Sequence, residues 1–180
     1  MYTAFEVEKM LGISEPTRQR LAKMGLLVPR KVGREQRYSA PEVLKWVNAA
    51  EAPRESALVV RMGMPGADKD GRKIGWLGPL MSDEKSASSG VERYTSEEQR
   101  DAVRKWWRIA DPEALIGLPL VAAVSDWAVG AWRIIGANRN EWGYVEFEVT
   151  TDVAIKDRWV ISRLNLPRGP VGAIRWPRPN

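Results

Sequence analysis

The sequence predicts an α+β protein with two parts, a small helix-rich unit over residues 1–52 and a mixed α+β, barrel-like domain over residues 53–180. The first part is indicated by two short amphipathic segments separated by a tight glycine turn. The second is indicated by several runs rich in β-branched and aromatic residues, with one helical segment among them. A polar stretch that contains a proline, residues 49–56, separates the two patterns and is the predicted linker.

The N-terminal residues predict a helix-turn-helix. Thr3 and Glu6 stand in the spacing of a capping box, which predicts a helix over residues 4–11 that ends at a glycine. Ser14, with a proline in the first turn after it, predicts a second helix over residues 15–24. Two short helices joined by a tight turn are the unit whose second helix enters the DNA major groove.

The second helix is the predicted DNA-reading element, with its polar side chains exposed. Arginine and glutamine can hydrogen-bond guanine and adenine edges at two points, whereas lysine and threonine more often hold phosphates. The alternative is that these charges form an ordinary solvated helix face. The candidate DNA-contacting residues of this helix are Thr17, Arg18, Gln19, Arg20 and Lys23.

The basic segment PRKVGREQRY follows, with a central glycine between two short extended arms. It predicts a wing, a two-stranded ribbon that lies along the DNA backbone beside the second helix. Ser39 then predicts a third helix from Pro41 to about Ala50, with Val43, Leu44 and Val47 facing the core. The candidate DNA-contacting residues of the wing are Arg30, Lys31, Arg34, Arg37 and Tyr38.

This ordered set of residues resembles the MerR-type winged helix-turn-helix, which MerR-family regulators, excisionases and some phage packaging subunits share. The family usually shows Thr-Leu-Arg followed by aromatic residues on the second helix, and this chain has Thr17-Arg18-Gln19-Arg20-Leu21 there. The role of the family arginine could therefore fall to Arg18 or to Arg20. The matching residues are Tyr2, Glu6 to Leu11, Gly12-Ile13-Ser14, Thr17, Gly25-Leu26-Leu27, Pro29, Arg37, Tyr38, Glu42, Val43 and Leu44.

Composition narrows the functional classes. The 28 Lys and Arg against 23 Asp and Glu give a net charge of +5, which suits a nucleic-acid partner. The absence of histidine and cysteine excludes disulfides, Cys/His zinc sites and histidine acid-base chemistry, and also the cysteine-based metal sensing of the best-known MerR-type regulators. No apolar run approaches the ~20 residues that span a bilayer, and no leader precedes the first helix. A soluble, cytoplasmic protein without a cofactor is expected.

The residues of the second part predict strands around one helix. They show no long helix with apolar heptads, of the kind that pairs MerR-type subunits, so no coiled-coil dimer is expected. The helix is expected to be capped by Thr95 or Ser96 and to bury Val103, Trp106, Trp107 and Ile109. The predicted strands are residues 57–64, 73–80, 120–124, 128–135, 142–151 and 158–166, with loops at 65–71, 82–92 and 137–141 and a tail over 167–180.

The segments RDAVRKWWRI, LVAAVSDWAVGAWRI and GYVEFEV are similar to small β-barrel domains of the PUA-like class, including EVE-like and ASCH-like members. The resemblance implies a pocket for a nucleobase or small-molecule effector, because a base gains ~1–3 kcal/mol by stacking on an aromatic ring. The alternative is that tryptophan is the large core residue of this chain. The candidate stacking residues are Trp106, Trp107, Trp127, Trp132 and Trp142.

Two other features bear on catalysis and on nucleic-acid binding. Acidic residues with a nearby lysine bind Mg²⁺ in some nucleases, but Glu146, Glu148, Asp152 and Lys156 have a spacing that charged strands often show by chance, so neither catalysis nor a metal is expected. The tail arginines suit either a basic arm in a minor groove or a basic terminus without a role. They are Arg168, Arg175 and Arg178.

The function that these features favour is sequence-specific binding of double-stranded DNA. A transcriptional regulator, for example a repressor of phage or mobile-element origin, is the leading role. An excisionase-like or packaging factor that bends or marks DNA is the first alternative, because such proteins share the MerR-type winged helix-turn-helix. A reader of modified nucleobases or RNA, acting through the second domain, is the other.

Overall fold

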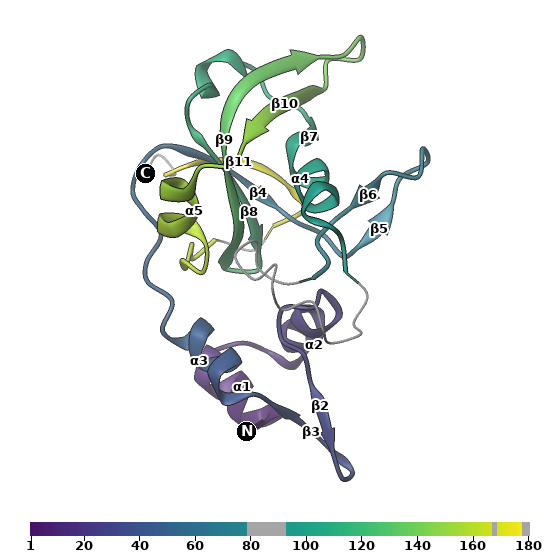
Figure 1. Ribbon diagram of the computed structural model, residues 1–180, viewed down its shortest axis with the longest axis vertical. Coiled ribbons are helices and arrows are strands. Elements are labelled where there is room, and N and C mark those ends of the chain that lie inside the picture. The colour runs from purple at the N-terminus through teal and green to yellow at the C-terminus, as the bar shows by residue number, and fades with distance from the viewer. Residues whose placement is uncertain (79–92, 167–168, 178–180) are drawn as a thin grey trace.

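The computed structural model describes residues 1–78, 93–166 and 169–177. Within these ranges the protein is mixed α+β, with five α-helices and a curled six-stranded sheet (Figure 1). The first three helices and a basic hairpin lie at one end of the molecule, and the large sheet lies at the other (Figure 1). No helix in the described ranges is both long and apolar enough to cross a lipid bilayer.

The N-terminal unit consists of three helices and a three-stranded sheet in the order β1-β3-β2. The capping box forms as expected, because Thr3 Oγ1 accepts from the Glu6 N–H at 3.2 Å and the Glu6 carboxylate accepts from the Thr3 N–H at 2.7 Å. The two predicted helices and the two-stranded ribbon are confirmed. The elements are β1 (Tyr2–Thr3), α1 (Ala4–Leu11), α2 (Glu15–Lys23), β2 (Arg30–Val32), β3 (Glu35–Tyr38) and α3 (Ala40–Val47).

The six-stranded sheet has the order β11-β4-β8-β9-β10-β7. Its neighbouring strands are antiparallel except β4 and β8, which run parallel. A small hairpin, β5–β6, projects beside α4 (Figure 1). The elements are β4 (Ala57–Arg61), β5 (Gly66–Ala67), β6 (Lys73–Ile74), α4 (Ser96–Arg104), β7 (Lys105–Trp107), the 3-10 turn η1 (Glu113–Leu115), β8 (Pro119–Val124), β9 (Trp127–Arg139), β10 (Val145–Thr150), α5 (Val153–Trp159) and β11 (Gly172–Trp176).

The centre of this sheet is buried on both faces, which explains why its strands are continuous apolar runs in the sequence. In β4, Leu58 and Val60 belong to one core cluster, whereas Ala57 and Val59 belong to the other. Helix α5 covers the second cluster through Ile155 and its neighbours, and α4 lies on the opposite side of the sheet (Figure 1). The first cluster continues into the N-terminal unit.

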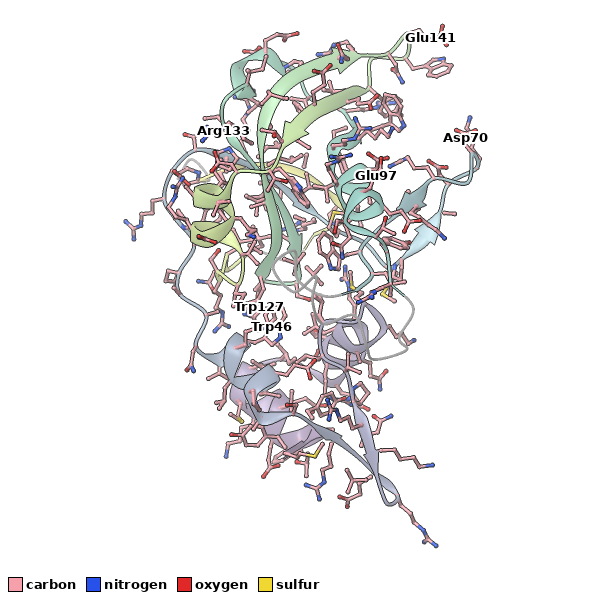
Figure 2. All side chains as sticks on the ribbon, viewed as in Figure 1. Trp46, Asp70, Glu97, Trp127, Arg133 and Glu141 are labelled. Atoms are coloured by element: carbon pink, nitrogen blue, oxygen red, sulfur yellow. The ribbon has the colours of Figure 1, made fainter. Side chains whose placement is uncertain are left out.

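The N-terminal unit packs directly on the sheet. The rings of Trp46 on α3 and Trp127 on β9 meet edge to face with centroids 5.6 Å apart (Figure 2). The Gly78 N–H donates to the Met24 carbonyl at 2.9 Å. The predicted linker is also attached, because the Arg163 N–H donates to the Ala50 carbonyl at 2.7 Å. Apolar packing and backbone hydrogen bonds therefore hold the two parts together.

Helix α3 departs from the prediction in its length and in its buried face. It ends at Val47 rather than near Ala50. Val43 is buried as expected, but Leu44 and Val47 are 37% and 38% exposed, and Trp46 takes the inward position instead. The reason is tertiary, because Trp46 packs against the Trp127 ring on the large sheet, a contact that the local sequence does not indicate.

Helix α4 ends before the last of the residues that were predicted to form its buried face. It ends at Arg104, and residues 105–107 form the edge strand β7 beside β10. Val103 is buried, but Trp106 is 39% exposed, so the predicted helical stripe is wrong beyond Val103. The strand is favoured because Arg104 and Lys105 both reach the Glu146 carboxylate on β10.

The C-terminal elements also differ from the prediction. Residues 158–166 do not form a strand; helix α5 occupies residues 153–159, and the last strand is β11 at residues 172–176. Strand β9 extends over residues 137–139 of the predicted loop, and the turn lies at residues 140–144. The predicted loop at 82–92 and the tail residues Arg168 and Arg178 lie outside the described residues.

Asp152 links α5 to the sheet, and its contribution to the stability of the fold depends on pH. Its carboxylate accepts from the Ile155 N–H at 3.0 Å and from Arg133 Nε at 2.8 Å, and these contacts lower the pKa of Asp152 below its ordinary value. A carboxyl with a lowered folded pKa stabilises the fold above its unfolded pKa of about 3.9 and loses that contribution as pH falls through the folded pKa.

We therefore expect Asp152→Asn to be less stable than the parent chain above about pH 5. Asparagine remains a good helix cap but cannot pair with Arg133 as an anion. The difference in urea midpoint should shrink as pH falls below about 3.9. Asp157→Asn is the matched control, because Asp157 is on the same helix, is exposed, and makes no side-chain hydrogen bond with the described residues. A difference that stays constant down to pH 2 would contradict this account.

Candidate nucleic-acid interface

Helix α2 and the β2–β3 hairpin are positioned by short, local signals. Gly12 ends α1 at φ 65°, a left-handed conformation that glycine adopts without strain. Three residues later α2 begins with Ser14 as its N-cap, although the Ser14 hydroxyl bonds Thr17 Oγ1 at 3.1 Å instead of a backbone N–H. Gly33, at φ 62°, forms the hairpin turn. The hairpin extends away from the rest of the molecule, beyond α2 (Figure 1).

Arg18 is not on the exposed face of α2. It is 6% exposed, and its guanidinium donates to Glu8 Oε1 at 2.7 Å and to the Tyr38 hydroxyl at 2.6 Å. Burial acts to lower the pKa of Arg18, but these two hydrogen bonds outweigh it and raise the pKa above its ordinary value. Arg18 therefore remains a cation that ties α1, α2 and β3 together.

Tyr38 is likewise internal, with no exposed surface. Its ring lies beneath the Arg18 guanidinium, 5.8 Å from centroid to Cζ. Both residues were predicted to touch DNA, and the structure places both inside the N-terminal unit. They are positioning residues, because they fix the angle between α2 and the hairpin strand that ends at Tyr38.

Arg20 points toward the large sheet. Its Nη2 donates to the Met62 carbonyl at 2.8 Å, and its Nε is buried without a partner among the described residues. Of the two arginines that could take the family arginine's role, neither lies on the open surface of α2. The exposed polar residues there are Glu15, Gln19 and Lys23, and Gln19 Nε2 donates to Glu15 Oε1 at 2.9 Å.

The hairpin carries the exposed positive charge of this end of the molecule. Arg30, Lys31 and Arg34 are exposed, and no carboxylate of the described residues lies within ion-pair distance of them. Arg37 is half-buried and pairs with Glu35 on the same strand. Three cations on one short ribbon are the arrangement that a phosphate backbone would bind.

The candidate stacking residues do not line one pocket. Trp127 and Trp132 are buried, at 1% and 3% exposure, and belong to the core. Trp107 is half-buried and donates from Nε1 to the Val103 carbonyl at 2.6 Å. Trp106 on β7 and Trp142 in the β9–β10 turn are 39% and 72% exposed. Core packing explains three of these rings, and two remain available at the surface.

The acidic set on and after β10 does not converge either. Glu146 pairs with Arg104 and Lys105, Glu148 accepts from Asn138, and Asp152 pairs with Arg133. The described residues contain no group of three potential metal-ligating side chains. Arg175, from the predicted tail, is exposed on β11 and donates to the Asp111 carbonyl at 3.1 Å.

A cleft of about 490 Å³ lies where the start of α2 meets the large sheet; we call it the junction cleft. Thr17 and Arg20 line it from α2, and Arg61, Ser125 and Asp126 line it from the sheet. The sequence offered no signal for the last three, because Arg61 follows an apolar strand and Ser125-Asp126 is an ordinary turn. They come together only because β4 and β8 are neighbours in the sheet.

The chain was compared with protein-family models, curated proteins and solved structures, and none of these comparisons finds a match. The resemblance to MerR-type DNA-binding domains therefore remains a prediction from the residue pattern.

Proposed function

We propose that the protein binds double-stranded DNA through α2 and the β2–β3 hairpin, and that it acts as a transcriptional regulator. The observation that carries the proposal is the row of exposed cations on the hairpin, Arg30, Lys31 and Arg34, which have no acidic partner among the described residues. Cations of this kind release counterions when they meet DNA phosphates, and that release drives binding.

The buried contacts support a shared role for the helix and the hairpin. Arg18 bonds Tyr38 at the end of β3 and Glu8 on α1, so hydrogen bonds link α2 directly to the hairpin and to α1. Two elements linked in this way can hold phosphates with one member while the other meets base edges. On α2, Gln19 rather than Arg18 then reads the bases. Lys23 on the same helix lies near a phosphate.

The test is a fluorescence-anisotropy titration of duplex DNA at several salt concentrations, with a duplex obtained by selection from a random pool. Arg34→Ala and Lys31→Ala should each weaken binding roughly eightfold at 0.1 M salt, because one phosphate contact contributes about 0.9 to the slope of log affinity against log salt. Each variant should also reduce that slope by about one. Gln19→Ala should instead reduce the preference for the selected duplex over a scrambled one.

Lys69→Ala is the matched control, since Lys69 is an exposed cation in the other small hairpin, β5–β6. It should leave both affinity and slope unchanged. If the hairpin variants keep the parental slope, the hairpin is not a phosphate-binding element. A DNA-bending assay on the selected duplex distinguishes a regulator from an excisionase-like or packaging factor.

A second candidate function, recognition of unpaired nucleobases, is favoured by one observation. Trp142 is 72% exposed in the β9–β10 turn, and nearby Arg108 lies over the Tyr144 ring at 4.9 Å. Exposed aromatic rings beside arginine are the usual platform for stacked bases. Single-stranded RNA in the same titration separates the two functions, because hairpin variants would not affect it whereas Trp142→Ala would.

A further inference from the structure

The junction cleft has the volume of a small-molecule site and a mainly polar lining. Its volume of about 490 Å³ lies within the roughly 300–1,000 Å³ of ligand pockets. Charged and hydroxyl side chains enter it from three separate elements: α2, the end of β4 and the β8–β9 turn. Apolar surface is present as well, from Ile13, Met62 and Val171. Such a mixture fits a ligand that has both a charged end and an apolar part.

Two arginines line the cleft. Arg20 donates to a carbonyl oxygen, and no described carboxylate pairs with it, so its positive charge is not neutralised by an acidic group there. Arg61 enters from the end of β4. The Gly169 backbone approaches this guanidinium closely, since a Cβ on Gly169 would lie 2.2 Å from Arg61 Nη1. Guanidinium groups are the preferred partners of phosphate oxygens.

A carboxylate and several hydroxyls share the cleft with these arginines. Ser125 and Asp126 form the two-residue turn between β8 and β9, in which Val124 pairs with Trp127 and Ser125 has φ 52°. The turn is held by the Leu164 N–H, which donates to the Asp126 carbonyl at 2.7 Å. The Asp126 carboxylate makes no hydrogen bond with the described residues and is therefore able to accept from a ligand. Carboxylates in nucleotide sites commonly accept from the sugar hydroxyls.

We propose that the junction cleft binds a nucleoside phosphate, with the phosphate on Arg20 and Arg61 and the sugar hydroxyls on Asp126. The same site would influence DNA binding, a consequence that rests on the proposed function. Thr17 and Arg20 belong to the helix proposed to meet DNA, and a bound phosphate adds negative charge beside it. Nucleotide binding therefore lowers affinity for DNA, and DNA lowers affinity for the nucleotide by the same factor.

The first experiment is isothermal titration of the full chain with AMP, GMP, CMP and UMP, with the matching nucleosides and with inorganic phosphate. At least one monophosphate should bind with one site per chain, at least tenfold more tightly than its nucleoside and than inorganic phosphate. Arg20→Gln and Asp126→Asn should each weaken that binding at least tenfold, and Lys69→Gln, which removes an exposed cation elsewhere, should leave it unchanged. Asp126→Asn is the safeguard if Arg20→Gln fails to fold.

Several outcomes would overturn the proposal. These are no binding by any of the four monophosphates, equal binding of inorganic phosphate, or full binding by a folded Asp126→Asn variant. The DNA titration separates this proposal from the proposed function. If DNA binds and no nucleotide does, only the cleft assignment fails; if a nucleotide binds and DNA does not, only the DNA proposal and the coupling fail.

Discussion

Arg18→Met is expected to lower the free energy of unfolding by about 3 kcal/mol, one of the largest effects of any single change in the N-terminal unit. The guanidinium is 6% exposed and supplies a donor to Glu8 and to Tyr38. Methionine fills most of the space but leaves a carboxylate and a hydroxyl in a partly buried site without their donor. Because whole domains are stable by only about 5–15 kcal/mol, such a loss is readily measured.

Urea unfolding of the full chain provides the measurement. Lys23→Met on the same helix is the matched control, because Lys23 is exposed and its loss should change stability by less than about 0.5 kcal/mol. Adding Glu8→Gln to Arg18→Met should restore part of the lost stability by removing the unpaired charge. A folded Arg18→Met variant with parental stability and altered DNA sequence preference would show that Arg18 contacts bases after all.

The second large effect is expected at the contact between the two parts of the chain. Trp46→Ala and Trp127→Ala should each cost about 3–5 kcal/mol, the usual range for a buried aromatic ring replaced by alanine. Trp127 is 1% exposed and Trp46 3%, and the two rings meet edge to face. Because they touch, the double variant should lose about 1 kcal/mol less than the sum of the single losses.

Calorimetry measures these losses of stability and also shows whether the two parts unfold in one transition. The parent chain should unfold in one transition, since a single core cluster contains residues of both parts. Trp127→Phe should cost less than Trp127→Ala, because the Trp127 Nε1–H is buried without a partner among the described residues and phenylalanine removes it. Trp142→Ala, at an exposed ring, is the control that should change little. Strict additivity of the single losses would mean that the rings are not energetically coupled.

Failed predictions in the second part have identifiable causes. Residues 158–166 contain β-branched and aromatic side chains, which favoured a strand, but Asp152 caps a helix whose inward residues Ile155 and Trp159 are four apart. That cap and spacing were visible in the sequence. By contrast, nothing local indicated that the chain would leave α4 at Arg104 and continue as β7, because Trp107 of that strand pairs with Val145 on β10, far along the chain.

The features that follow from the sequence alone are those whose causes lie within a few residues. They include the Thr3–Glu6 capping box, the glycine that ends α1, the glycine in the hairpin turn and the alternating strands. Caps, turns and periodicity act locally. Which charged residues are buried, and which line the same cleft, depends on packing between distant elements. Arg18 is internal because Glu8 and Tyr38 surround it, and Arg20, Arg61 and Asp126 line one cleft because the sheet packs against α2. Burial and convergence depend on partners distant in the chain, and a pattern of residue types does not specify those partners.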